Sequence, residues 1–111
     1  MSTGDVLSTS GGRYPISQVE DLACRGWVNA TLRVSQWLSN HGYDVRETIL
    51  EVLVSVGSRG KYIGSCTLMN GAKADEYMVS LGDDDWYLKF WVDEVEMIVN
   101  VWSCCWDGAV H

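Results

Sequence analysis

The chain has 111 residues, 47% of them hydrophobic, with a single proline and a net charge of −7. This length suits one domain, and the composition is that of a globular chain rather than a disordered one. No apolar run approaches the roughly 20 residues that cross a bilayer, and residues 1–12 lack the basic and apolar regions of a secretory signal. We therefore expect a cytoplasmic protein with no membrane segment.

Charge is divided unevenly along the chain. Residues 1–74 carry seven Lys/Arg and six Asp/Glu, whereas residues 75–111 carry one Lys and nine Asp/Glu. Because binding to nucleic acid depends on basic side chains that neutralise phosphates, the acidic second part disfavours RNA as a partner. The same acidity favours a basic partner protein.

The sequence predicts a flexible N-terminal arm followed by a first helix. Residues 1–13 are rich in Ser, Thr and Gly and predict a flexible N-terminal arm, so that residues 14–111 form the single domain. Ser17 and Glu20 match a capping box, which predicts a short helix that ends at Gly26.

Two further helices are predicted by caps and apolar spacing. The second is expected between Thr31 and Gly42, with its apolar side chains on one face. The third is expected to begin at Asp44, which forms a second capping box with Glu47, and to run through Val56 before Gly57 ends it.

After residue 60 the hydrophobic period changes from 3.6 to 2, which indicates strands. Four are predicted, at residues 61–69, 74–81, 86–92 and 95–102. Asn70-Gly71 predicts a type I′ turn between the first two. Since no segment of helical length separates these strands, we expect no parallel pairs. The prediction is an α+β domain in which two to three N-terminal helices pack on a four-stranded antiparallel meander.

The last two strands present aromatic side chains on both faces. One face is uniformly apolar and is expected against the helices: Trp86, Leu88, Phe90, Val92, Val95, Met97, Val99 and Val101. The other face is mixed: Tyr87, Lys89, Trp91, Glu96, Ile98, Asn100 and Trp102. Either the arm or the C-terminal tail covers this second face, or Trp91, Trp102, Asn100 and Tyr87 form a binding surface for a partner.

Metal and cofactor signals are weak. The adjacent Cys104 and Cys105 point to opposite faces of a strand, a poor geometry for a disulfide, so reduced thiols are the main interpretation. A zinc site from Cys104, Cys105 and His111 is the alternative. Asp83–Asp85 is interpreted as a solvated turn rather than a cation site, and His41 as a helix cap. We expect no metal and no cofactor.

Several short strings, taken together and in order, resemble a known group. Over residues 14–103 the chain resembles the MqsR-type toxins of the RelE-like ribonuclease fold. The similar strings are ISQVEDLACRGWV (16–28), KYIGSC (61–66), Asp75-Glu76-Tyr77, Tyr87-Leu88-Lys89 and Met97-Ile98-Val99-Asn100.

The resemblance implies metal-independent cleavage of messenger RNA and neutralisation by an antitoxin. Residue by residue, it keeps Tyr87 and Lys89 as catalytic groups. Three other polar positions of the family fall on Ile63, Ala74 and Trp102, and Lys61 or Lys73 is then the available substitute cation. Losing one donor to the transition state costs roughly 10²–10³ in rate.

Two hypotheses remain. The first is a diverged toxin-antitoxin-like protein that binds a partner protein, a ligand or a second copy of itself, with weak or lost cleavage. The second is an active endoribonuclease that uses Tyr87, Lys89 and Lys61.

Overall fold

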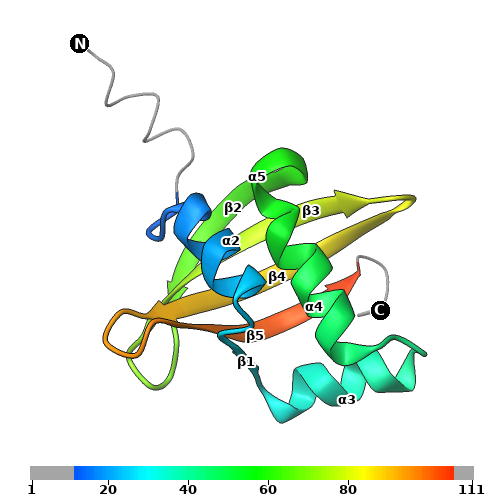
Figure 1. The fold of residues 1–111 in the computed structure, drawn as a ribbon, viewed down its shortest axis with the longest axis horizontal. Coiled ribbons are helices and arrows are strands. Elements are labelled where there is room, and N and C mark those ends of the chain that lie inside the picture. The colour runs from blue at the N-terminus through cyan, green and yellow to red at the C-terminus, as the bar shows by residue number, and fades with distance from the viewer. Residues whose placement is uncertain (1–11, 107–111) are drawn as a thin grey trace.

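The computed structural model describes residues 12–106, in which four helices pack on a five-stranded sheet. The helices are α2 (Ile16–Cys24), α3 (Leu32–Asn40), α4 (Val45–Val54) and α5 (Val56–Arg59). The strands are β1 (Val28–Ala30), β2 (Gly60–Thr67), β3 (Lys73–Leu81), β4 (Asp84–Asp93) and β5 (Ile98–Trp106). Figure 1 shows α2, α4 and α5 over one face of the sheet, with α3 at the end of that layer, where it contacts β5.

The sheet is mixed, with the strand order β1-β5-β4-β3-β2. β2, β3, β4 and β5 pair in succession as antiparallel neighbours. β1 pairs with β5 in parallel, Val28 opposite Val99 and Ala30 opposite Val101.

The α+β class is therefore confirmed, but the expectation of four strands without a parallel pair is wrong. β1 has three residues, too few for an alternating pattern to show in the sequence. Its connection to β5 passes through the rest of the domain and supplies the long crossover that parallel neighbours need.

Two of the three predicted helix starts are confirmed. Thr31 Oγ1 accepts from the N–H of Val34 at 3.2 Å, and Asp44 Oδ1 accepts from the N–H of Glu47 at 2.9 Å. The Ser17 capping box is wrong, because Pro15 is the N-cap of α2 and no side chain caps that end. The carbonyl of Pro15 accepts from the N–H groups of Gln18 and Val19, each at 3.1 Å, so the helix begins at Ile16, earlier than the box indicates.

Glu20, the other member of that box, makes a longer-range bond. Its Oε2 accepts from the N–H of Gly57 at 3.0 Å, which links α2 to α5. Gly57 lies inside α5 and does not end the third predicted helix; α4 stops at Val54 and α5 continues to Arg59. The predicted end is therefore wrong by several residues.

The first two of the three hairpin turns in the antiparallel part differ from each other. Gly71 has a φ of +88°, but Asn70 does not have the positive φ that a type I′ turn requires, so that prediction is wrong. Instead, Asn70 Oδ1 accepts from the N–H of Ala72 at 2.9 Å, a local turn that competes with the I′ geometry. In the next hairpin Gly82 has a φ of +62° at the first central position, the pattern of a type II′ turn.

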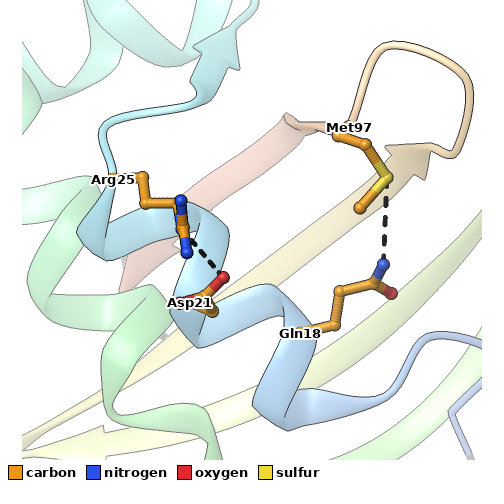
Figure 2. Close-up of polar contacts among 4 residues, drawn as sticks. All are labelled: Gln18, Asp21, Arg25 and Met97. Carbon is orange, nitrogen blue, oxygen red and sulfur yellow. Dashed lines mark hydrogen bonds and ion pairs between the residues drawn. The ribbon is translucent and has the colours of Figure 1, made fainter.

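The turn from β4 to β5 is longer than predicted. β5 begins at Ile98 rather than Val95, and Met97 has a φ of +58°, the one non-glycine residue in the described chain with a positive value. Figure 2 shows Met97 facing Gln18 of α2, whose Nε2 lies 4.0 Å from the Met97 sulfur. The sequence predicts Val95 in the core, but its side chain is 91% exposed. Val95 lies in the turn between β4 and β5, where the alternation of a strand does not apply.

The core lies between the helices and one face of the sheet. Among its largest fully buried side chains are Leu38 of α3, Leu53 of α4, and Leu88 and Phe90 of β4. Apart from Val95 and the half-buried Met97, the face predicted to meet the helices is buried: Trp86, Leu88, Phe90, Val92, Val99 and Val101. The opposite side of the sheet, called the outer face below, carries no helix of the described chain (Figure 1).

Candidate functional site

The outer face carries aromatic, sulfur-containing and charged side chains on its three central strands. Most of them are half-buried: Glu76, Met78, Tyr87, Lys89, Trp91, Asn100, Trp102 and Cys105. Cross-strand register places them in rows, with Met78 opposite Tyr87 and Glu76 opposite Lys89. Side chains in such rows lie within about 4.5–8 Å of their neighbours, so the set forms one continuous surface.

A β-bulge places Trp102 on this surface. Lys89 pairs with Ser103 and Phe90 with Val101, so Trp102 is an extra residue with no partner on β4. The bulge shifts the alternation of β5 by one: Val99, Val101 and then Cys104 are buried on the helix side. The sequence pattern alone does not reveal this extra residue, although it predicted the outward direction of Trp102.

Tyr87 is held in place by Glu76. The Tyr87 hydroxyl donates to Glu76 Oε1 at 2.7 Å, across neighbouring strands. Lys89 lies beside them, with Nζ 5.9 Å from the centre of the Tyr87 ring. The two residues that the resemblance keeps as catalytic groups are therefore brought together. Glu76, an acid that the sequence reasoning did not place in the site, bonds one of them and lies opposite the other.

The electrostatics of this group keep the phenol protonated. Burial, followed by the hydrogen bond to Glu76, raises the pKa of Tyr87 well above its usual value of 10.0. Burial also raises the pKa of the nearby Cys66 thiol, and Lys89 opposes that rise. A neutral phenol that already donates its proton to a carboxylate is a hydrogen-bonding group rather than a general base at neutral pH.

The other predicted catalytic residue is separated from this pair. Lys61, on β2, lies opposite Met78 of β3, and Met78 lies opposite Tyr87 of β4. The strand β3 therefore separates the lysine from the phenol. Lys73, the second substitute, donates to Thr67 Oγ1 at 2.7 Å at the other end of β3. The structure therefore joins two of the proposed catalytic groups and leaves the substitute cations outside.

The predicted binding residues occupy two parts of the outer face. Trp91 and Asn100 are directly opposite each other on β4 and β5. Trp102 and Tyr87 line a cavity of about 310 Å³ that reaches round the edge of β5 to Arg33 and Trp37 of α3. The aromatic surface thus continues past the sheet edge onto the helix layer.

Sequence reasoning missed a second polar cluster, on the helix side of β3. Asp75 is completely buried; its Oδ2 accepts from the N–H of Tyr14 at 3.0 Å and its Oδ1 from Ser65 Oγ at 3.1 Å. Ser65 Oγ also hydrogen-bonds the Tyr62 hydroxyl. Alternation along β3 places Asp75 on the same face as Tyr77 and Val79, so the sequence pattern could have predicted that Asp75 is buried.

Tyr77 completes this cluster. Its side chain is buried, and its hydroxyl has no hydrogen-bond partner among residues 12–106. The Cα of Gly12 passes so close that an added Cβ would lie 2.3 Å from this hydroxyl. Burial and then the charge of Asp75 raise the pKa of Tyr77 from 10.0 to about 12.

The cysteines do not form a site in the described part of the chain. Cys104 is buried on the helix side, and burial raises its pKa from 9.0 to about 12, which makes it an unreactive thiol. Cys105 lies on the outer face, so the two thiols face opposite sides of the sheet, and His111, the third residue of the zinc alternative, lies outside the described residues. Residues 12–106 contain no group of three His, Cys, Asp or Glu side chains that could hold a metal ion.

His41 is the C-cap of α3, as predicted. Its Nδ1 lies 2.8 Å from the carbonyl oxygen of Trp37, and the two rings stack at 3.9 Å. Trp106 packs edge-on against Trp37 at 5.5 Å, so the end of β5 joins the helix layer.

Comparison of the chain with protein-family models, with curated proteins and with solved structures finds no match in any of the three. The helices within residues 12–106 are too short to cross a bilayer, the longest having 10 residues.

Proposed function

We propose that this chain is a diverged, cytoplasmic relative of the MqsR/RelE-type toxins that works as a protein-binding module and has lost most or all RNA cleavage. Its recognition surface is the outer face around Tyr87, Trp91 and Trp102. The observation that carries the proposal is the bond from the Tyr87 hydroxyl to Glu76 Oε1, 2.7 Å long. It converts the residue that the resemblance makes catalytic into a fixed part of a binding surface.

The composition of this face supports binding rather than chemistry. Trp and Tyr are the side chains that dominate interface hot spots, because each buries a large area while keeping one polar group. Trp91, Trp102 and Tyr87 are all half-buried on strands, so their positions are largely set before a partner arrives. A surface of this kind loses little conformational entropy on binding.

Charge favours a basic partner. The chain carries −7 overall, and residues 75–111 account for −8 of that balance. A second copy of the chain would meet long-range repulsion, and RNA would meet the same repulsion more strongly. We therefore prefer a basic partner protein to a homodimer, and either of them to RNA.

The proposal is tested with the double variant Trp91→Ala/Trp102→Ala. The wild-type protein is used as bait in its own cells; the captured protein is identified, purified and titrated calorimetrically against both forms. The double variant should bind at least about 30-fold more weakly, the loss expected for hot-spot residues. Met69→Ala, at a fully exposed position in the loop between β2 and β3, is the control and should bind like the wild type.

Covered indoles would overturn the proposal. If residues 1–11 or 107–111 cover the indoles, the double variant should lose thermal stability and keep its mass in sedimentation, with no partner affected. The outer face would then be a second core rather than a binding surface.

One observation supports the alternative function, an active ribonuclease. Lys89 and Tyr87 lie side by side, with the Lys89 Nζ 5.9 Å from the centre of the Tyr87 ring. Purified protein incubated with messenger RNA, next to a Tyr87→Phe/Lys89→Ala control, tests it. We expect the two traces to be the same. Cleavage by the wild type that the control lacks would establish the enzyme and reject the binding module as the main function.

A further inference from the structure

β1 is a short edge strand whose outward side is open. The N–H of Val99 donates to the carbonyl of Trp27 at 3.0 Å, and the N–H of Thr31 donates to that of Val101 at 3.2 Å. In a parallel pair, alternate residues direct both backbone groups to the same neighbour. Trp27, Asn29 and Thr31 therefore face β5. Val28 and Ala30 direct their N–H and C=O groups away from the sheet, where the described chain places no further strand.

The two edges of the sheet differ in how they are protected. β2, at the other edge, has a register shift at Ile63 and an exposed Lys61, two devices that discourage a further strand. β1 has the sequence VNA, with no charge, no proline and no register shift. Of the two edges, β1 is the one left able to accept a strand.

Hollows flank β1 on both sides. On the helix side a cavity of about 440 Å³ is lined mainly by apolar side chains of α2 and α4, including Val45, Ile49 and Leu50, with Arg46 among its lining residues. On the outer side a cavity of about 330 Å³ is lined by Trp27, Ile98 and Glu96, among others. Successive side chains of an added strand would point alternately into these two cavities.

The outer-side hollow has an acidic character. Glu96 lines it, and Glu94 is also exposed in the same turn between β4 and β5. Arg25, the C-cap of α2, is a basic side chain beside this hollow, with its Cζ 5.5 Å from the centre of the Trp27 ring. Its charge is paired with Asp21, whose Oδ2 lies 3.0 Å from the Arg25 Nε, as Figure 2 shows. The helix-side hollow is shaped for aliphatic groups, whereas the outer one favours a lysine or an arginine.

We propose that the free edge of β1 binds an extended segment of a partner protein as a sixth strand. Aliphatic side chains of that segment enter the helix-side hollow, and basic side chains enter the outer one beside Glu96. The occupant is an extended peptide because a peptide backbone presents C=O and N–H groups at the spacing of the outward N–H and C=O groups of Val28 and Ala30. This site lies at the sheet edge and does not use Tyr87, Trp91 or Trp102 of the outer face.

The test uses a fluorescent seven-residue peptide that alternates lysine and valine, titrated against the full chain. We expect saturable binding together with slower hydrogen exchange at the amides of Val28 and Ala30. Ala30→Pro removes an outward N–H without touching the bonds to β5, and should weaken binding about tenfold. The same peptide with N-methyl groups on the amides that would face β1 should lose affinity to a similar extent.

Further binding measurements distinguish this site from nonspecific charge attraction and from binding at the outer face. A glutamate/valine peptide should bind poorly to the wild type and better to Glu96→Lys, whereas Trp91→Ala/Trp102→Ala should leave lysine/valine binding unchanged. The absence of saturable binding, or equal affinity for the N-methyl peptide, would overturn the proposal. Self-association that Ala30→Pro abolishes would overturn it too, by making a second copy of the chain the occupant.

Discussion

The backbone N–H of Tyr14 donates to Oδ2 of Asp75 at 3.0 Å, which joins residues 61 positions apart in the sequence. The bond fixes the segment before α2 against β3. A second bond supports it, because the Tyr14 hydroxyl donates to the carbonyl of Lys73 at 2.5 Å. Asp75 is thus a buried acid with a structural partner on either side, since Ser65 bonds its other oxygen.

Replacing this carboxylate should cost stability. Asp75→Ala leaves the Tyr14 N–H and the Ser65 hydroxyl without their acceptor inside the protein, so the free energy of unfolding should fall by about 2–4 kcal/mol. Urea denaturation followed by circular dichroism measures the change. Asp83→Ala, in the exposed turn after β3, is the control and should change stability by less than about 0.5 kcal/mol. Equal effects in the two variants would contradict the structural role of Asp75.

Tyr77 should make stability depend on alkaline pH. Its pKa is raised from 10.0 to about 12, so the folded state holds the phenolic proton more tightly than the unfolded state does. The resulting contribution is complete below pH 10 and is lost as the pH rises from 10 toward 12. The stability of the wild type should therefore fall relative to that of Tyr77→Phe over this range, whichever of the two is the more stable at pH 8. Parallel curves from pH 8 to pH 12 would reject the assignment.

Tyr87 and Glu76 should be energetically coupled. A double-mutant cycle with Tyr87→Phe and Glu76→Gln should give a coupling free energy of about 1–2 kcal/mol, because the hydrogen bond goes to an ionised acceptor but is only partly buried. Unfolding in urea supplies all four free energies. A coupling near zero would show that the bond does not hold the phenol in place, and would weaken the argument for a preset binding surface.

Gly82 should be far less replaceable than Gly64. Gly82→Ala puts a Cβ on a residue with a φ of +62° and should cost about 1–2 kcal/mol. Gly64→Ala is the matched control, since Gly64 lies on β2 without a positive φ and an added Cβ there meets nothing within 4 Å. The control should be neutral or stabilising by up to about 1 kcal/mol. A similar loss in both would mean that the type II′ turn does not govern this hairpin.

What could be predicted from the sequence was mainly local. The caps at Thr31 and Asp44 depend on residues within one turn, and both are present. The buried side of β4 follows from alternation over seven residues, a pattern long enough to be unambiguous. The failures at Val95 and Asn70 share a cause: each assumes regular backbone up to a turn whose own hydrogen bonds set a different geometry.

The remaining features depend on contacts between distant parts of the chain. The bond from Gly57 to Glu20 and the pairing of β1 with β5 cannot be read from neighbouring residues. The same holds at the site. The positions of Tyr87 and Lys89 on one face follow from the period of a strand, but the donation to Glu76 requires the register of β3 against β4.

The position of β1 also sets an order of events during synthesis. Val28 pairs with Val99, which the ribosome adds 71 residues later (99 − 28). At roughly 5–20 residues per second, β1 waits about 4–14 s for its neighbour. During that time both of its sides are unpaired, the condition in which strands join other molecules. A chain that stalls before Val99 keeps residues 28–30 in this condition, and such truncated chains should aggregate through them.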